Sequence, residues 1–207
     1  MTTARPLRQD AARNRERLVL AAREVFRRKG LHAPLEDIAR EAGVAIGTLY
    51  NRFPSRSELV DAALGPLAER AVELAEAAAG ADDPWAGFAM YVEDTCALFA
   101  AERGYADVYR ATVPDTPVIS AAKDRLTALK LSILDRAKRS GALRADVEST
   151  DIAILTWAAV STMDATRAVA PQMWRRHLAL LLDGLRAEAA HPLPAPPLTP
   201  AQLREAG

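Results

Sequence analysis

Apolar residues recur along most of the chain at spacings of three and four, which is the period of an amphipathic α-helix. The first such segment should begin near Asp10 and end before Gly30, with basic residues in its last turn. Its inward face consists of Leu18, Ala22, Val25 and Phe26. Alternating β-branched segments bounded by turns, which would predict strands, are missing. The pattern predicts an all-α protein.

Two short helices follow, separated by a glycine turn. Apolar positions at i, i+3, i+4 and i+7 define the first of them, namely Leu35, Ile38, Ala39 and Ala42. Gly43 ends this helix, and the second must fit between that glycine and Pro54. Leu49 and Phe53, four residues apart, form its inner face. Together the two helices predict a helix-turn-helix.

A longer helix begins at the capping box SRSE, residues 55–58. We expect a kink or break in it at Gly65-Pro66, because proline lacks a backbone donor and clashes with the preceding turn. Further helices are predicted from apolar segments at about 85–102, 105–112, 117–139, 149–169 and 172–189. From His191 onward the chain is rich in proline, and we expect an extended or disordered tail.

Charge is distributed unevenly, although the 27 Lys and Arg balance the 27 Asp and Glu. The first thirty residues hold nine basic and three acidic side chains, which would make attraction for a polyanion local to this end. Taken alone, that charge is explained as well by a solvated helix face. The single cysteine, Cys96, fits the role of a small buried hydrophobe. Without a signal peptide or a membrane-length apolar run, we expect a cytoplasmic protein with no membrane partner.

The second helix of the helix-turn-helix carries side chains suited to DNA on its predicted outer face. Its first turn, residues 45–48, is small or apolar enough to approach base edges or a thymine methyl group. Tyr50 and Arg52, with Arg56 just beyond, project donors that suit phosphate oxygens. The motif therefore favours a DNA-binding function.

At these residues the chain resembles the TetR family of transcriptional regulators. Members share an aromatic residue and a glycine at the end of the first helix, here Phe26 and Gly30. They also share the pattern IA-x-x-AGV-x-x-GTLY-x-x-F, which residues 38–53 match at every fixed position, and a charged capping segment that ends here at Leu59. The resemblance covers roughly residues 10–60. It implies an N-terminal three-helix helix-turn-helix DNA-binding domain and a C-terminal helical ligand-binding and dimerisation domain.

This resemblance implies four parts: a flexible basic arm at 1–9, the DNA-binding domain at 10–56, a helical regulatory and dimerisation domain at 57–190, and the tail at 191–207. Positions that contact DNA in the family correspond to Ile46, Gly47, Thr48, Tyr50, Asn51, Arg52 and Arg56. Core packing explains Ile46 nearly as well, and Tyr50 could also brace two helices. Arg5, Arg8 and Arg13 could reach the DNA backbone or minor groove, although solvent exposure fits them better.

The chain lacks two helix caps that are common in the family. Ala45 precedes the recognition helix where Ser or Thr is frequent, and Ala33-Pro34 stands where a hydroxyl cap usually starts the preceding helix. We therefore expect the recognition helix to be less rigid when it is not bound to DNA.

The C-terminal segments suit dimerisation and ligand binding. Segment 172–189 is apolar around much of its circumference, so it must be buried on two sides, either by a partner or as a core helix of a monomer. Because a symmetric operator has two half-sites and each needs its own recognition helix, we expect a homodimer through residues 149–189. Candidate residues for a small, largely apolar effector are Phe88, Tyr91, Thr95, Phe99, Tyr105, Tyr109, Trp157 and Thr162. Core packing is the better explanation for each of them individually.

The resemblance implies a ligand-responsive repressor that binds a palindromic double-stranded operator as a dimer and is released by a small-molecule effector. Two other classes stay open, an all-α protein-interaction module and an enzyme without a recognisable catalytic motif. His32, His177 and His191 have no metal-ligand spacing, and neither a Gly-rich phosphate loop nor G-x-S-x-G nor H-E-x-x-H occurs. We therefore expect no enzymatic activity, no metal and no cofactor.

Overall fold

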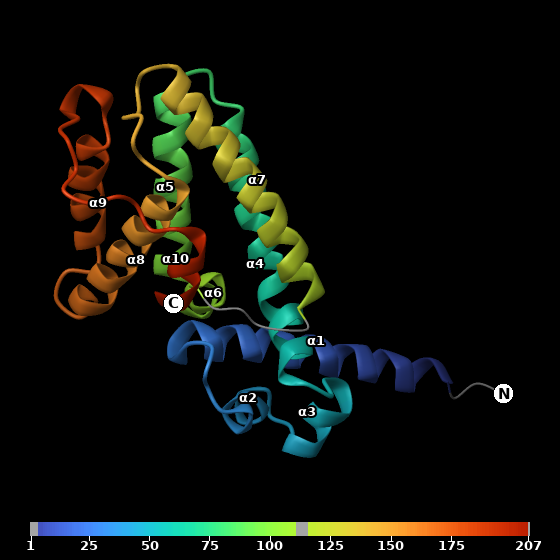
Figure 1. Cartoon of the computed structure of the whole chain (residues 1–207). Helices are drawn as coiled ribbons and strands as arrows, with labels where there is room; N and C mark the ends of the chain where they lie inside the picture. Colours follow the sequence, from blue (N-terminus) through green and yellow to red (C-terminus); the bar gives the residue numbers. More distant parts are fainter. Residues whose placement is uncertain (1–3, 111–115, 207) are drawn as a thin grey trace. The chain divides into compact units, whose positions relative to one another are not determined.

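The computed structural model describes residues 4–110 and 116–206, and the regular secondary structure of these residues is helical (Figure 1). The helices are α1 (Ala4–Lys29), α2 (Leu35–Glu41), α3 (Ile46–Arg52), α4 (Arg56–Ala79), α5 (Pro84–Ala101), α6 (Arg103–Arg110), α7 (Pro117–Arg139), α8 (Ser149–Thr166), α9 (Met173–Gly184) and α10 (Pro200–Ala206). A short 3₁₀ helix spans Ala187–Ala189. The expected all-α fold is confirmed.

The helices group into two compact units, residues 1–69 with 102–122, and residues 70–101 with 123–207. This division differs from the sequence-based one, which separated 10–56 from 57–190, because α6 packs on α1. A Cβ atom at Gly104 would lie 2.7 Å from the Cβ of Phe26, so glycine is what allows the two helices to approach so closely. The segment that carries α6 therefore belongs to the first unit.

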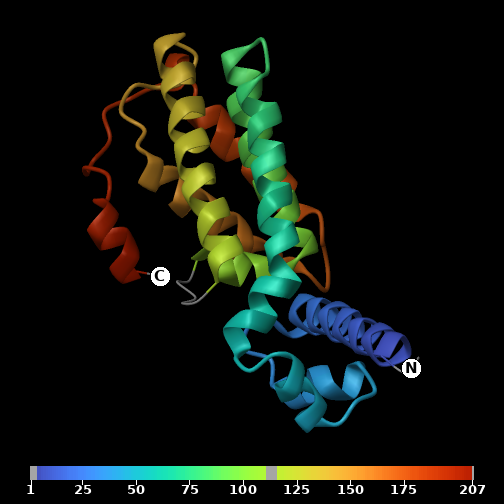
Figure 2. The same ribbon diagram turned by 90° about the vertical axis from the view of Figure 1, so that its right-hand side faces the viewer.

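α1 is the centre of the first unit. Its predicted inner face is buried, since Leu18, Ala22, Val25 and Phe26 each expose 1% or less of their surface. Figures 1 and 2 both show α2 and α3 on the same side of α1. The helix ends where the sequence predicts, because Gly30 adopts φ 79° and its amide donates to the Phe26 carbonyl at 2.9 Å.

The second unit is built on α5, α8 and α9, which pack on one another (Figure 1). The buried face of α9 carries Trp174, Leu178 and Leu182. The C-terminal halves of α4 and α7 lie side by side in Figure 2, and the guanidinium of Arg136 on α7 bonds to backbone carbonyls at the end of α4. Both apolar packing and arginine-to-backbone bonds thus hold this unit together.

The first helix begins at Ala4 rather than near Asp10, so it includes residues that the sequence analysis assigned to the arm at 1–9. Pro6 falls in its first turn, where the missing N–H has no helical acceptor to lose. Between Pro6 and Asp10 the sequence contains neither a glycine nor a second proline, so nothing interrupts the helix.

Of the kink or break expected at Gly65-Pro66, the break is wrong, because α4 runs through both residues, and the kink stays a prediction. The residue before a proline normally avoids the helical region partly because its Cβ clashes with the ring. Gly65 has no Cβ, so that conflict is reduced. A Cβ there would also lie 3.0 Å from Cγ1 of Val118, which gives the glycine a second role in packing α4 against α7.

The tail 191–207 is not wholly extended, since α10 lies within it. Pro200 occupies the first helical position, which its fixed φ suits. Thr199 and Gln202 form a capping box: the amide of Gln202 donates to Thr199 Oγ1 at 3.3 Å, and the amide of Thr199 donates to Gln202 Oε1 at 2.9 Å. The pattern T-P-x-Q at residues 199–202 is therefore the sequence feature that predicts the start of α10.

Candidate nucleic-acid interface

The turn between α2 and α3 is fixed by backbone hydrogen bonds. Gly43 has φ 66°, its amide donates to the Arg40 carbonyl at 3.1 Å, and the amide of Val44 donates to the Ala39 carbonyl at 3.0 Å. This pair of bonds is the Schellman motif, which requires a residue that tolerates positive φ. The glycine of the sequence pattern thus sets the direction in which α3 leaves the turn.

α3 has one buried and one exposed side. Leu49 and Phe53 are buried, at 0% and 1% exposure, and fasten the helix to the unit. Gly47, Tyr50, Asn51 and Arg52 are exposed, whereas Ile46 and Thr48 are half-buried. A Cβ added at Gly47 would meet no heavy atom within 4 Å, so the space in front of the first turn is open. This side can approach another molecule closely.

The structure ties Arg56 to the backbone of the loop between α1 and α2. Its guanidinium donates to the Ala33 carbonyl at 2.6 Å and also bonds to the carbonyl of Leu31, and it lies over the Phe26 ring, 5.9 Å from the centroid. Burial lowers the pKa of this guanidinium. Arg56 therefore holds the loop between α1 and α2 to the start of α4, and its contact with a phosphate stays a prediction.

The recognition helix lacks a side-chain cap, as its sequence indicates. Ala45 occupies the N-cap position in an extended conformation, and no side chain bonds to the first turn from there. The Ala45 carbonyl accepts from the amide of Thr48 at 2.9 Å, which begins the helix. At α2, Pro34 likewise provides no side-chain cap.

Two exposed arginines of α1, which sequence reasoning counted only as charge, lie at the two ends of α3. Arg17 donates to the Ala42 carbonyl at 2.5 Å, at the turn before α3, and Arg15 lies over the Phe53 ring, 4.9 Å from its centroid, just after α3. No spacing rule links them to α3, because the contacts depend on how α1 crosses the motif. Arg13 is also exposed, while the side chains of Arg5 and Arg8 lie outside the described residues.

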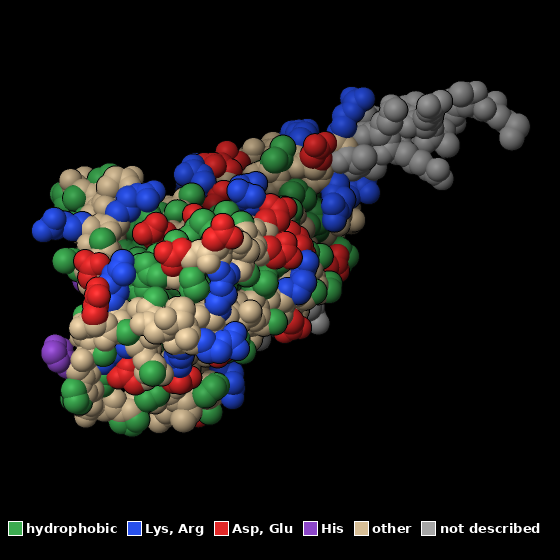
Figure 3. Space-filling model, turned by 90° about the horizontal axis from the view of Figure 1, so that it is seen from above, with side chains coloured by type: hydrophobic (Ala, Val, Ile, Leu, Met, Phe, Trp, Pro, Cys, Tyr) green, Lys and Arg blue, Asp and Glu red, His purple; other side chains and the backbone are tan. Residues whose placement is uncertain are grey.

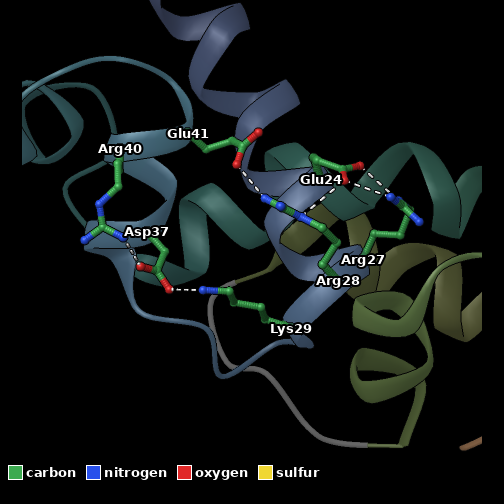
Figure 4. Close-up of polar contacts among 7 residues, drawn as sticks. All are labelled: Glu24, Arg27, Arg28, Lys29, Asp37, Arg40 and Glu41. Atoms are coloured by element: carbon green, nitrogen blue, oxygen red, sulfur yellow. Dashed lines mark hydrogen bonds and ion pairs between the residues drawn. The ribbon is translucent and has the colours of Figure 1, made fainter.

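Acidic partners neutralise much of the remaining basic charge of α1 (Figure 4). Arg28 contacts Glu41 at 2.5 Å, and Lys29 contacts Asp37 at 2.7 Å. The hydrogen bond from Lys29 holds the pKa of Asp37 below its ordinary value, and Arg40 adds to this effect. Among the side chains that the structure describes, the charge available to a polyanion is therefore concentrated on residues 13–17 of α1 and on α3.

The face drawn in Figure 3 carries no field of one sign. Lys and Arg side chains are interspersed there with Asp and Glu side chains.

The eight predicted effector residues are divided between the two units. Tyr105 and Tyr109 lie on α6 of the first unit, and the others lie on α5 and α8 of the second. The four that are buried are Phe88, Tyr91, Phe99 and Tyr105. Thr95, Tyr109, Trp157 and Thr162 are half-buried, and the Thr162 hydroxyl donates to the Ala158 carbonyl at 2.9 Å. As one effector site, this set stays a prediction.

Other candidate chemistry is sparse in the part of the chain that the structure describes. Groups of three or more His, Cys, Asp or Glu that could hold a metal ion do not occur among the described residues. Burial raises the pKa of the Cys96 thiol to about 12, as expected for a packed cysteine. Within 4–110 and 116–206, no helix combines the length and apolarity that crossing a bilayer requires.

Comparison with known proteins gives consistent matches over both parts of the chain. Residues 18–63 match the family model of bacterial regulatory proteins, tetR family, and residues 83–187 match that of the C-terminal domain of SbtR-like transcriptional regulators. A TetR transcriptional regulator from Streptomyces coelicolor is 30% identical, over 83% of this chain and 98% of that one, with a TM-score of 0.52. A TetR transcription regulatory protein from Mycobacterium vanbaalenii is 31% identical, over 87% and 99%, with a TM-score of 0.50.

More distant solved structures share the fold. The transcriptional regulator FadR from Bacillus subtilis, in complex with stearoyl-CoA, is 18% identical over 85% of this chain and 99% of that one, with a TM-score of 0.64. Taken together, the outward-facing helix-turn-helix and the second helical unit define a transcriptional regulator that binds DNA. The chain belongs to the TetR family.

Proposed function

We propose that this regulator is a repressor that binds a palindromic double-stranded operator as a homodimer and is released by a small-molecule effector. The observation that carries the proposal is the open outer side of α3, where Gly47 has no neighbour within 4 Å of an added Cβ and Tyr50 is 49% exposed. A helix with small residues in its first turn can enter the major groove and read base edges there. Such a regulator would act in the cytoplasm, with the DNA.

The proposed contacts divide by chemistry. Gly47 and Thr48 would lie nearest the base edges, with Ile46 at the margin because it is half-buried. Tyr50, Asn51 and Arg52 are exposed donors that suit phosphate oxygens. Arg56 is left out of this set, because its Nη2 already donates to two backbone carbonyls.

Homodimerisation through residues 149–189 is supported by apolar side chains left exposed on α8 and α9. Ile154, Met173 and Leu180 are 39%, 44% and 61% exposed. Met173 and Leu180 are seven residues apart and share one side of α9, while exposed Ser161 and Ala165 continue the side of α8 that carries Ile154. Small residues let a second helix approach closely. In a dimer, two recognition helices about 34–36 Å apart would match consecutive major grooves.

The effector would act by favouring a state of the dimer that binds DNA less well. The size of the effect is set by the difference in the effector's affinity for the two states of the dimer. An ordinary coupling free energy between effector binding and DNA binding is roughly 1–3 kcal/mol. Among the solved structures with this fold, Bacillus subtilis FadR was solved with stearoyl-CoA, which supports an effector with apolar character.

The salt dependence of DNA binding tests this proposal. DNA selected from a random pool by the wild-type chain would be titrated at several salt concentrations with wild type, Arg52→Ala and Arg139→Ala. Binding should weaken steeply with salt, and the slope should fall by about two for Arg52→Ala, because each subunit of the dimer loses one phosphate contact. Arg139, an exposed arginine of α7, is the matched control and should leave the slope unchanged. Failure of wild type to select any DNA would overturn the proposal.

A further inference from the structure

The second unit contains a pocket of about 290 Å³ where the ends of α5 and α8 meet the start of α9. Its floor is apolar, because it includes Met163 and Trp174, which are 5% and 2% exposed. Ala97 and Ala100 of α5 line another side, and their small side chains leave the space unfilled. None of the eight residues predicted as effector contacts lines this pocket.

Two arginines and a glutamine supply most of the polar lining. Arg167 directly follows α8, Arg175 lies on α9, and Gln172 lies in the turn between these helices. Among the described residues that line the pocket there is no carboxylate. Arg167 is paired at 3.0 Å with Asp164, whose side chain is 45% exposed and lies outside the lining. The pocket therefore combines an apolar floor with two arginines, of which Arg167 is paired with a carboxylate and Arg175 is not.

Arg175 is held in a defined orientation. Its Nε donates to Gln172 Oε1 at 2.9 Å, and its guanidinium lies over the Trp174 ring, 4.5 Å from the centroid. Neither partner is charged, and no carboxylate lies within ion-pair distance of Arg175 among the residues that the structure describes. A guanidinium fixed in this way loses little conformational freedom when it binds an anion.

The proposed dimer face would leave this pocket open. On α9, Arg175 lies two residues after Met173, so the two side chains point about 200° apart around the helix. Arg167, the C-cap residue of α8, keeps helical φ and ψ and lies two residues after Ala165, with the same angular separation. A partner covering Met173 and Ala165 would therefore approach the opposite side of each helix.

We infer that this pocket binds a small monocarboxylate with an apolar body, and that such a ligand is the effector; the second part rests on the proposed function. The planar guanidinium fork matches the two oxygens of a carboxylate. The apolar floor would contact the body of the ligand, and purely polar anions would gain nothing there. The volume is near the lower end of the range for small-molecule sites, about 300–1,000 Å³, so the ligand is small.

Calorimetric titration of the full-length chain tests the ligand class without DNA. The probes are benzoate and octanoate, with benzyl alcohol and 1-octanol as neutral counterparts and acetate and inorganic phosphate as polar anions. The two apolar carboxylates should bind at least tenfold more tightly than any of the other four. Equal binding of a carboxylate and its alcohol, or tighter binding of phosphate, would overturn the inference.

Three variants locate the site. Arg175→Gln and Arg167→Gln should each weaken octanoate binding roughly tenfold while 1-octanol binding stays the same. Arg176→Gln is the matched control, because Arg176 is exposed, is the next residue on α9 and does not line the pocket. These changes lie at the surface and should not prevent folding. If Arg176→Gln lost as much affinity as Arg175→Gln, the assigned pocket would be wrong.

A last measurement separates this inference from the proposed function. Octanoate is added to wild type and to Arg175→Gln, each bound to its selected DNA. Release from wild type at concentrations that leave Arg175→Gln bound supports the effector role. If octanoate binds in the pocket without changing DNA affinity, the effector role is overturned and the carboxylate site remains. If no DNA is bound at all, the proposed function fails, whereas the calorimetric result still decides the inference about the pocket.

Discussion

The arginines in two regions of the molecule should contribute very differently to stability. One region is the ion-pair cluster at the end of α1, drawn in Figure 4, and the other is the end of α4 in the second unit. In the cluster, Arg28 pairs with Glu41, and side chains on both sides of the pair remain more than a third exposed. In the second unit, Arg136 bonds to the carbonyls of Ala79, Ala81 and Asp82, which follow or end α4 and lack helical partners. Exposed pairs gain little, because water and salt screen them. Arginines that satisfy backbone carbonyls at a helix end contribute more.

Arg144, like Arg136, donates to a backbone carbonyl in the second unit. Only 7% of this residue is exposed, and it bonds to Asp146 through two nitrogens and to the His191 carbonyl at 2.6 Å. It thereby joins the segment after α7 to the segment after α9. The lesson is that a count of charged residues says little until the acceptor of each one is known.

The largest effect on stability should come from Arg136→Ala. Three backbone carbonyls lose a charged donor, and we expect the free energy of unfolding to fall by about 3 kcal/mol. Arg139→Ala, three residues further along α7, removes only an exposed pair with Asp135 and should change stability by less than about 0.5 kcal/mol. Urea denaturation of both variants measures the difference. Equal losses of stability in the two variants would show that the kind of acceptor, backbone carbonyl or carboxylate, does not decide how much an arginine stabilises the protein.

Arg56→Ala should have the next largest effect, a loss of about 2 kcal/mol in the free energy of unfolding. It removes bonds to the carbonyls of Leu31 and Ala33 and the contact with the Phe26 ring. Arg52→Ala, on the exposed side of α3, should stay within about 0.5 kcal/mol of wild type. An unchanged stability in Arg56→Ala, with a reduced salt slope for DNA, would restore Arg56 as a phosphate contact.

The smallest effect concerns pH and the exposed pair of Lys29 and Asp37. Because the pKa of Asp37 is lowered in the folded state, the pair stabilises the protein above the ordinary carboxyl pKa of about 3.9. That contribution is lost as the pH falls through the lowered value. In Lys29→Ala, carbon-detected NMR titration should find the Asp37 pKa raised towards the ordinary value. An identical titration curve in both proteins would mean that Lys29 does not act on Asp37.

Much of the first unit could be predicted from sequence because its signals are local. Gly43 and Pro54 bracket α3, and the burial of Leu49 and Phe53 follows from their spacing. Arg56 could not be placed in this way, since its acceptors lie 23 and 25 residues away in the chain. Charge and position suggested phosphate, whereas the fold provides backbone carbonyls.

The second unit was less predictable for the same physical reason. Its pocket joins residues of α5 to residues of α8 and α9, and no periodicity relates Ala97 to Arg175. Phe88 and Phe99, which composition predicts as ligand contacts, are buried on α5, and their contact with an effector stays a prediction. Local rules also failed at Pro66, where the absent Cβ of Gly65 removes part of the conflict that would break a helix.

The most direct test of the central claim, that the outer side of α3 binds DNA, is the affinity of Gly47→Glu for the selected operator. Nothing lies within 4 Å of an added Cβ, and an acid suits the first turn of a helix, so the melting temperature should be unchanged or slightly higher. DNA affinity should fall by roughly a hundredfold or more, because each subunit would place a carboxylate against the groove. A folded Gly47→Glu protein that binds this DNA as tightly as wild type would contradict the account.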